Sequence, residues 1–472
     1  MVFSSLFFLC VFLPINIFLY YAVNNNTYKN AVLIVSSLAF YAWGEPIWIS
    51  VLVLSALFNY FIGVSIERSR GSRKGKGILV LAVAVNLFVL GFFKYFGFIT
   101  ESINTLLGIS VPVISIGLPI GISFYTFKSI SYIVDVYRGE VGAQKSFFKF
   151  LLYISLFHNL VAGPIVRYKD IEQDIENRAL GFESFSNGVS RFIIGLGKKV
   201  IIANQANEFS KAFLDMDYSR LPVLGAWAGI LLYAIEIYFD FSGYSDMAIG
   251  LGKMYGFNYK ENFNYPYIAK SVTEFWRRWH ISLTSFFKDY VYIPLGGNRK
   301  HHVRNMLVVW LLTGLWHGAG WNFVVWGLYF FVLLVIEKYI LLKFEKKIPA
   351  VFWRLYFVAA ILVGWVFFYH TGIDRAFRFL GIMFGINAPS LSSPEVGIFL
   401  NSYMIFIVIA LVGCTPLMKS IFDRIKGSLQ RIRIGAYSVD QLIKSTVNIA
   451  ILIVSIIMLV GQSYNPFLYF KF

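Results

Sequence analysis

Long apolar stretches alternate with short polar segments along the whole chain, a pattern that predicts helices of membrane length. The stretches at residues 31–41 and 305–315 are too short to cross ~30 Å of hydrocarbon at about 1.5 Å per residue. We therefore expect broken or re-entrant helices, packed inside the bundle, at these two places. In all, the pattern predicts roughly eleven to thirteen spanning or buried elements, at residues 2–21, 31–41, 47–66, 78–98, 120–136, 147–161, 192–203, 224–241, 305–315, 321–341, 352–369, 403–417 and 447–459.

The composition excludes a water-soluble protein. Of the 472 residues, 58% are hydrophobic and only 14% are charged, and the mean hydropathy is +0.66. A soluble core cannot hide so many apolar residues, whereas a bilayer accepts them on the outside of a helix bundle. We expect an all-α polytopic membrane protein in which residues 1–472 form one membrane domain. Residues 1–23 have neither a basic n-region nor a small-residue cleavage site, so we expect a retained spanning helix and not a signal peptide.

The formal net charge of +17 indicates membrane topology and not nucleic-acid binding, because the basic residues fall in short clusters between apolar stretches. The loop at residues 67–77 carries five Lys or Arg, which predicts that it is cytoplasmic. The N-terminus is then expected outside, and the basic segments 343–347 and 419–433 inside. The tail at residues 465–467 is expected outside. Anionic membrane lipids or an anionic cytosolic ligand are the predicted partners of these charges.

The segment at residues 253–304 is the most basic, with nine Lys or Arg against three acids. Placed on one helix, residues 271–290 put Arg277, His280, Thr284 and Lys288 on the side opposite Trp276, Trp279, Leu283 and Phe286. This pattern predicts an amphipathic helix that lies at the membrane interface with its cations facing a polar ligand. Two interpretations stay open, attraction to lipid headgroups and binding of a phosphorylated donor such as coenzyme A. In the second, Arg277 and Arg278 bind the donor.

His317 lies in LTGLWHGAGWN (residues 312–322), an apolar helix that breaks at small residues and is followed at once by another apolar helix. If Arg304 marks the cytoplasmic surface, thirteen helical residues place His317 roughly 20 Å deeper. An ionisable group at that depth is costly and is a functional candidate, with Trp316, Asn322 or an Asp of another helix as its expected partner. The alternative is a neutral histidine bonded to a carbonyl in a helix kink.

Acidic residues in an aromatic helix form a third candidate feature. The polar run YFDFSGYSD (residues 238–246) is predicted to interrupt this helix. Buried acids there either pair with Lys or Arg as structural bridges or orient a catalytic histidine. We expect a structural role for Glu236 and a place in the site for Asp246, together with Tyr244 from the same run.

Other histidines, cysteines and glycines are predicted to be structural. His301 and His302 lie in a basic loop, where solvated imidazoles are expected. Neither Cys10 nor Cys414 has the spacing of a zinc site or a disulfide framework, so we expect no metal site. Two glycine pairs lack the spacing and preceding strand of a dinucleotide loop and instead predict close helix packing; they lie at residues 195–197 and 250–252.

A linked set of motifs resembles the membrane-bound O-acyltransferase family, in particular its bacterial alginate and peptidoglycan O-acetyltransferase branch. The resemblance covers most of the chain from about residue 118 onward. The motifs that carry it are LPIGISFYTFKSISYIVDVYR (118–138), LVAGPIVR (160–167), YFDFSGYSD (238–246), FWRRWHISLT (275–284), YIPLGGN (292–298) and GLWHGA (314–319).

This resemblance implies a fold, a reaction and two site residues. His317 matches the intramembrane histidine of the family, and His280 matches the second motif histidine of this branch. The implied fold is a ring of tilted and broken helices around a central tunnel that joins a cytosolic donor site to an outer acceptor site. The implied reaction moves an acyl group, acetyl foremost, from a cytosolic acyl-CoA donor to a cell-surface polysaccharide, with no bound cofactor. A separate extracytoplasmic transferase of the SGNH-hydrolase type is the implied partner.

Two other readings of the sequence stay open. A proton-coupled transporter or flippase would also place ionisable residues inside the membrane. The transporter hypothesis assigns no function to the basic segment that carries His280. The other reading keeps acyl transfer and changes the acceptor to a lipid or a protein, or changes the group transferred to D-alanine.

Overall fold

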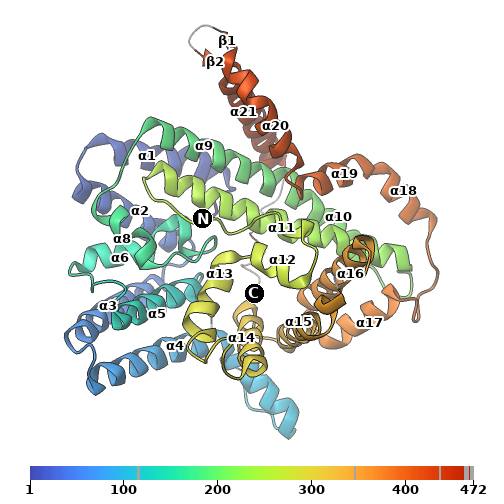
Figure 1. Cartoon of the computed structure of the whole chain (residues 1–472), viewed down its shortest axis with the longest axis horizontal. Helices are drawn as coiled ribbons and strands as arrows, with labels where there is room; N and C mark the ends of the chain where they lie inside the picture. Colours follow the sequence, from blue (N-terminus) through green and yellow to red (C-terminus); the bar gives the residue numbers. More distant parts are fainter. Residues whose placement is uncertain (114–116, 345–346, 435–436, 462–466, 468–472) are drawn as a thin grey trace.

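Helices form almost the whole molecule (Figure 1). The computed structural model describes residues 1–113, 117–344, 347–434, 437–461 and 467. Two short strands pair antiparallel, β1 (Arg433–Ile434) with β2 (Tyr437–Ser438). The helices, in chain order, are η1 (Phe8–Phe12), α1 (Leu13–Ala22), α2 (Asn26–Gly44), α3 (Ile49–Arg68), α4 (Arg73–Leu107), α5 (Ile122–Arg138), α6 (Phe147–Ser155), α7 (Phe157–Leu160), α8 (Tyr168–Glu176), α9 (Phe182–Gly197), η2 (Lys198–Ala203), α10 (Asn204–Leu214), α11 (Val223–Met254), η3 (Pro266–Ile268), α12 (Val272–Arg278), α13 (Ile281–Phe287), η4 (Lys288–Tyr292), α14 (His302–His317), α15 (Trp321–Tyr339), η5 (Leu341–Phe344), α16 (Ala350–Tyr369), α17 (Ile373–Met383), α18 (Pro394–Ser402), α19 (Met404–Gly413), α20 (Leu417–Arg431) and α21 (Val439–Gly461).

Among the described residues, six helices are long and apolar enough to cross a membrane, or seven if the bent pair α18 and α19 forms one span. This confirms the expected all-α polytopic membrane protein. The prediction of a short element at residues 31–41 was wrong, because α2 has 19 residues. The Asn25 side chain starts it earlier by accepting a hydrogen bond from the backbone N–H of Tyr28. At 16 residues, α14 remains short for a single crossing.

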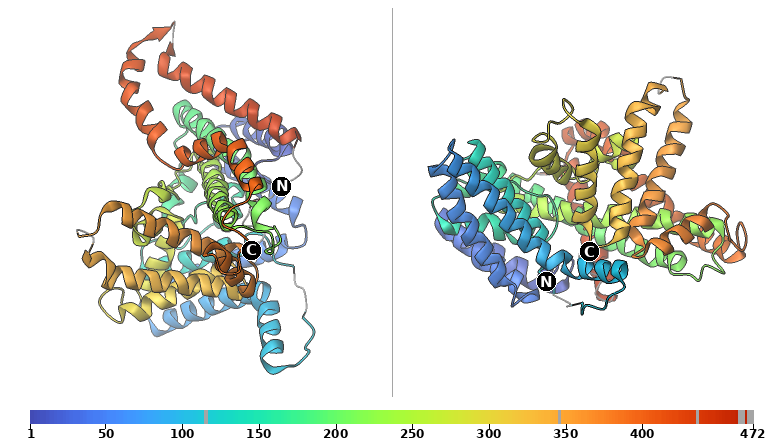
Figure 2. Two further views of the ribbon diagram at one scale, coloured as in Figure 1. Left: turned by 90° about the vertical axis from the view of Figure 1, so that its right-hand side faces the viewer. Right: turned by 90° about the horizontal axis from the view of Figure 1, so that it is seen from below.

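Short helices occupy the middle of the molecule, and longer helices surround them (Figures 1 and 2). In Figure 1, α3, α4 and α5 lie on one side of α12 and α13, α15 and α16 lie on the other, and α9 and α11 run above them. Elements far apart in the sequence therefore meet around the α12–α13 segment. The hairpin of α20 and α21 projects from this body.

The long helix α11 is continuous through the polar run at residues 238–246, so the predicted interruption was wrong. Its acids are neutralised by neighbours, which removes the need to expose them. Asp240 pairs with Lys199 at 2.5 Å, and Asp246 pairs with Lys198 at 2.7 Å and with Arg191 at 2.6 Å. The acids of this run are therefore bridges from α11 to α9 and η2.

Glycines let α9 and α11 approach backbone to backbone, as predicted from the two glycine pairs. A Cβ placed on Gly195 would lie 2.6 Å from the carbonyl oxygen of Gly243, and one on Gly250 would lie 2.6 Å from the backbone nitrogen of Phe192. Only a residue without a side chain fits either position. This close crossing holds α11 directly against α9.

The predicted outer tail lies largely outside the described residues, which include only Phe467 after Gly461. The Phe467 ring is buried, with its centroid 4.7 Å from that of Tyr244 and 5.8 Å from that of Phe241. These contacts place Phe467 against α11.

Candidate active site

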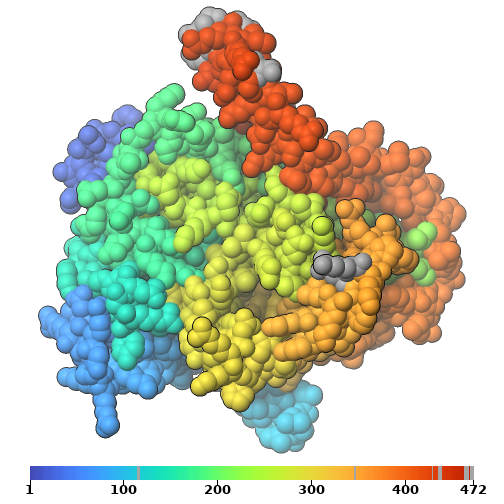
Figure 3. Space-filling view, viewed as in Figure 1, coloured from blue at the N-terminus to red at the C-terminus, as the bar shows by residue number. Residues whose placement is uncertain are grey.

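A cavity of about 740 Å³ opens between the short central helices and α15. Figure 3 shows it as a hollow bordered by α12, α13 and α14 on one side and α15 on the other. Its size falls in the range of about 300–1,000 Å³ that is usual for small-molecule sites. The polar and charged residues of its lining are Thr273, Arg277, His280, Thr284, Lys288, Asn298, His302, Thr313, His317 and Lys338.

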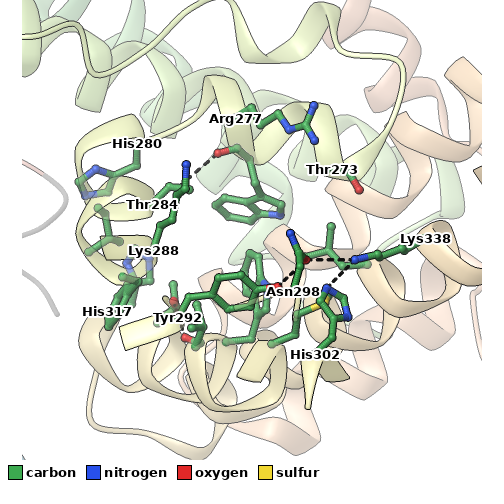
Figure 4. A pocket seen from close by; sticks show the side chains of 18 of the residues that line it. Thr273, Arg277, His280, Thr284, Lys288, Tyr292, Asn298, His302, His317 and Lys338 are labelled. Carbon is green, nitrogen blue, oxygen red and sulfur yellow. Dashed lines mark hydrogen bonds between the residues drawn. The ribbon is translucent and has the colours of Figure 1, made fainter. Parts of the chain in front are cut away.

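The entrance of this cavity is cationic. Arg277, Lys288 and Lys338 line it and are exposed, and no Asp or Glu occurs among its described lining residues. Figure 4 shows the three cations arriving from different elements, α12, η4 and α15. A positive field without a compensating acid attracts an anionic ligand. Arg277, His280, Thr284 and Lys288 all line this cavity, but so do Trp276 and Leu283 from the predicted apolar side, so the lining does not separate the two predicted sides.

Hydrogen bonds order the α15 side of the entrance. Lys338 Nζ donates to His302 Nε2 at 2.7 Å and to Asn298 Oδ1 at 3.3 Å, and the Tyr292 hydroxyl donates to the same Asn298 oxygen at 2.8 Å (Figure 4). Partial burial and the charge of Lys338 lower the pKa of His302, which begins α14 at the surface. The imidazole is therefore neutral at pH 7 and accepts from Lys338. The expectation of a freely solvated His302 was wrong.

The predicted continuous interfacial helix at residues 271–290 is broken in the structure. Its parts are α12, α13 and the π-helical turn η4, with the break at Trp279 and His280. His280 has a φ of 44°, a left-handed conformation that costs a non-glycine residue about 1–3 kcal/mol. The break turns His280 inward, so that it is only 2% exposed and not solvated in an interfacial helix.

Asn262 holds the His280 turn in place. Its Oδ1 accepts hydrogen bonds from the Ser282 hydroxyl at 2.8 Å and the Ser282 backbone N–H at 3.2 Å, and it lies 3.3 Å from His280 Nδ1. The Asn262 Nδ2 donates to Ser245 of α11, and its carbonyl accepts from the backbone N–H of Ile281. These bonds offset the backbone strain at His280. No local pattern in the sequence indicates this role of Asn262, which lies eighteen residues before His280.

The buried carboxylate of Glu337 fixes the start of α12. It accepts from the backbone N–H groups of Val272 at 2.6 Å and Thr273 at 2.9 Å, two of the donors that a helix start leaves unpaired. The Ser271 side chain accepts from the backbone N–H of Glu274. Adjacent residues of α15 therefore have different roles. Glu337 binds the start of α12, and Lys338 lines the entrance of the cavity.

His317 ends α14, where glycines pack this helix tightly against α15. A Cβ on Gly314 would lie 2.3 Å from the carbonyl oxygen of Phe323, and one on Gly327 would lie 2.4 Å from that of Trp310. The backbones therefore touch on both sides of the turn. This contact explains why the motif around His317 is rich in small residues, and it gives the histidine a rigid base.

Aromatic rings enclose His317, which is 4% exposed. Its ring centroid lies 5.0 Å from that of Trp326 and 5.1 Å from that of Phe368, both edge to face. Trp316 lies between the two histidines, 5.0 Å from His317 and 5.5 Å from His280 by ring centroids. The two histidines expected from the sequence to act together thus line one cavity, joined through a tryptophan.

Trp316 and four other predicted site residues lie outside the lining of this cavity. Arg278 turns away and pairs with Glu274 at 2.8 Å. Asn322 donates to the carbonyl oxygen of Phe367 at 3.2 Å, which makes it a helix bridge. The remaining two, Asp246 and Tyr244, lie on α11, the first in ion pairs and the second between the rings of Phe3 and Phe467. Trp316 is buried beside both histidines.

Comparison with known proteins identifies the family to which these motifs belong. The family model for membrane-bound O-acyltransferases matches residues 140–374, which include both histidines. The chain is 38% identical to a probable alginate O-acetylase of Pseudomonas putida over the full length of both, and 33% identical to the peptidoglycan O-acetyltransferase of Helicobacter pylori over all of this chain and 98% of that one. A teichoic acid D-alanyltransferase of Bacillus subtilis is 31% identical over 48% of this chain and 60% of its own. The chain belongs to the membrane-bound O-acyltransferase family and is a multi-pass membrane acyltransferase.

Proposed function

We propose that this protein takes an acyl group, acetyl foremost, from cytosolic acyl-CoA and passes it across the membrane for O-acetylation of an extracellular polysaccharide. The observation that carries the proposal is a single cavity with exposed cations at its entrance and two buried histidines in its lining. An enzyme with a cytosolic donor and an outer acceptor has to bridge the two compartments. A deep cavity that leads to an intramembrane histidine meets this requirement.

The charges of the entrance support a phosphorylated donor. Coenzyme A carries several phosphate charges at one end and a thioester at the other. Arg277, Lys288 and Lys338 would bind the phosphates near the surface, where guanidinium and ammonium groups are the usual partners of phosphate oxygens. The aromatic lining further in, which includes Trp276, Phe287 and Trp310, suits the uncharged arm of the donor.

His317 would act as the general base. A neutral imidazole takes the proton of the acceptor hydroxyl as the oxygen attacks the thioester carbonyl carbon. The new C–O bond forms, the C–S bond breaks, and the proton passes from the imidazole to the departing thiolate. The rings of Trp326 and Phe368 hold the imidazole and exclude water. Asn262 would fix His280 so that it contacts and polarises the thioester end of the donor.

Coverage of the relatives favours acetyl over D-alanyl transfer. The alginate and peptidoglycan O-acetyltransferases align with the whole chain, whereas the D-alanyltransferases align with less than half of it. By the positive-inside rule, the cationic entrance would face the cytoplasm, which supports the proposal of an inner-membrane location. An extracytoplasmic SGNH-type transferase would complete delivery to the polymer.

Acetyl transfer by sealed membrane vesicles tests the proposal. Vesicles that contain the wild-type protein are expected to release coenzyme A from acetyl-CoA slowly without an acceptor, and cells are expected to carry O-acetylated polymer. The His317→Ala variant is expected to insert and accumulate normally and to lose both activities by at least about 10²-fold, the usual contribution of a general base. His301→Ala changes an exposed histidine outside the cavity lining and is the matched control. Wild-type levels of polymer acetylation in the His317→Ala strain would contradict the assignment, and a transporter would release no coenzyme A.

A further inference from the structure

A second cavity, of about 110 Å³, also has His317 in its lining. Its other lining residues come from α4, from the start of α5 and the segment just before it, and also include Val161 and, from α14, Trp316; none of these residues lines the large cavity. Gly121 shapes this wall, because its φ is 77° and a Cβ there would lie 2.6 Å from the carbonyl oxygen of Leu160. His317 is thus the lining residue that the two cavities share, and α14 borders both of them.

The second cavity lies toward the outer side of the membrane. Lys94 of α4 lines it and follows Arg73, the first residue of that helix, by 21 residues, or about 31 Å of helix. The basic loop at residues 67–77, which runs into the start of α4, is predicted to be cytoplasmic. A position about 31 Å further along the helix therefore lies past the midplane of the hydrocarbon layer, on the side away from that loop.

Lys94 is the one Lys, Arg, Asp or Glu among the described lining residues of this cavity. Its Nζ donates to the carbonyl oxygen of Trp316 at 2.5 Å, and the neighbouring Tyr95 hydroxyl donates to that of Leu315 at 2.6 Å. Both bonds satisfy carbonyl groups that the end of α14 leaves unpaired. Tyr95 does this with a neutral hydroxyl, whereas a lysine carries more N–H donors than one carbonyl needs and places them beside His317.

The family resemblance implies an acceptor site on the outer side of His317, and we propose that Lys94 in the second cavity binds the acceptor oxygen whose proton His317 removes. The inference rests on the proposed acyl transfer and names the acceptor side of it. An N–H donor at the acceptor oxygen orients the hydroxyl and stabilises the negative charge that grows on it as the proton leaves. A volume of about 110 Å³ holds only a few heavy atoms, since a water occupies about 30 Å³ of liquid. The cavity therefore takes a primary alcohol on a narrow arm, entering end-on.

Small alcohols are suitable probes because they need no knowledge of the natural acceptor. With purified protein and acetyl-CoA, the wild type is expected to form ethyl acetate from ethanol and no ester from tert-butanol. Lys94→Met is expected to lower kcat/KM for ethanol by about 10²-fold, the usual effect of removing one such donor. Its Kd for coenzyme A is expected to stay unchanged, because Lys94 is not in the lining of the large cavity.

Two further variants distinguish the loss of acceptor binding from the loss of a hydrogen bond that caps α14. Tyr95→Phe removes the neighbouring cap of α14 without reaching the second cavity, so it is expected to lower thermal stability and to leave the KM for ethanol unchanged. Ser123→Leu fills the cavity from α5 without touching the Trp316 carbonyl and is expected to repeat the loss seen in Lys94→Met. Equal kcat/KM values for ethanol in Lys94→Met, Ser123→Leu and the wild type would overturn the inference, as would equal use of tert-butanol. A wild type that releases no coenzyme A from acetyl-CoA would instead overturn the proposed function.

Discussion

Replacement of Gly318 by alanine tests whether the packing behind His317 controls the reaction. Gly318 has a φ of −167°, an extended conformation open to any residue, so the effect of a methyl group there is purely steric. The added Cβ would lie 2.0 Å from Cε2 and 2.3 Å from Cδ2 of Phe323. Carbon atoms in contact lie about 3.5–4.0 Å apart, so the ring or the backbone has to move by about 1.5 Å.

The surroundings of Phe323 leave little room for that movement. Its ring packs edge to face on Phe368, with centroids 5.3 Å apart, and its carbonyl abuts Gly314. The strain therefore passes to the turn that carries His317. Overpacking of this kind costs about 1–3 kcal/mol of stability. A displacement of about 1 Å at a reacting group costs about 10²-fold in rate.

The assay compares Gly318→Ala with Gly372→Ala, because a Cβ at Gly372 meets nothing within 4 Å. Thermal stability in detergent and coenzyme A release from acetyl-CoA are measured for both variants. We expect a lower Tm and a rate lower by about 10²-fold for Gly318→Ala, and no change in either quantity for Gly372→Ala. A Gly318→Ala protein with the stability and rate of the wild type would refute the claim that Phe323 and the α14–α15 contact hold His317 in place.

Two more predictions follow from the geometry of the large cavity. Arg277→Gln is expected to raise the KM for acetyl-CoA several-fold and to weaken the dependence of this KM on salt. Arg278→Gln removes the contacts with Glu274 and with the Asn264 carbonyl, both outside the cavity lining, and is expected to leave both quantities unchanged. Steady-state kinetics at two ionic strengths decide, and equal effects of the two variants would leave only a general attraction to the lipid surface. Asn262→Ala is expected to lower kcat with little change in the Kd for coenzyme A and to cost about 1–3 kcal/mol of stability, because it leaves the buried Ser282 and His280 groups without their acceptor. Kinetics and thermal unfolding measure the two effects, and an unchanged kcat would show that the His280 turn holds without Asn262.

Local signals in the sequence were sufficient for the membrane class and for the key histidines. Apolar runs, basic clusters and a histidine beside a helix break each follow from the free-energy cost of placing polar groups in lipid. The same argument could have singled out Lys94, which lies inside the predicted apolar stretch at residues 78–98. The apolar residues on both sides of Lys94 make the stretch look like a uniform span, which hides this lysine in the sequence.

Predictions that required a partner elsewhere in the chain were less successful. Asp246 was predicted to be a site residue because it is an acid in an aromatic helix. In the fold, Lys198 and Arg191 neutralise it, and both come from segments distant in the sequence. The amphipathic pattern at residues 271–290 fits one helix, yet Asn262 and the rings around His280 stabilise a break in its middle. A periodic pattern describes which side a residue faces and contains no information on bonds to distant segments.

The sequence by itself determined that this chain is a helical membrane protein and that His317 ends an apolar helix inside it. These features follow from hydrophobicity and helical period, which depend only on neighbours along the chain. The tertiary structure alone decided that His280 is buried beside Trp316, that Lys338 joins the cationic entrance, and that His317 lines two cavities. These features depend on contacts between segments up to 222 residues apart, such as Lys94 and Trp316, and packing fixes such contacts only once the helices have assembled.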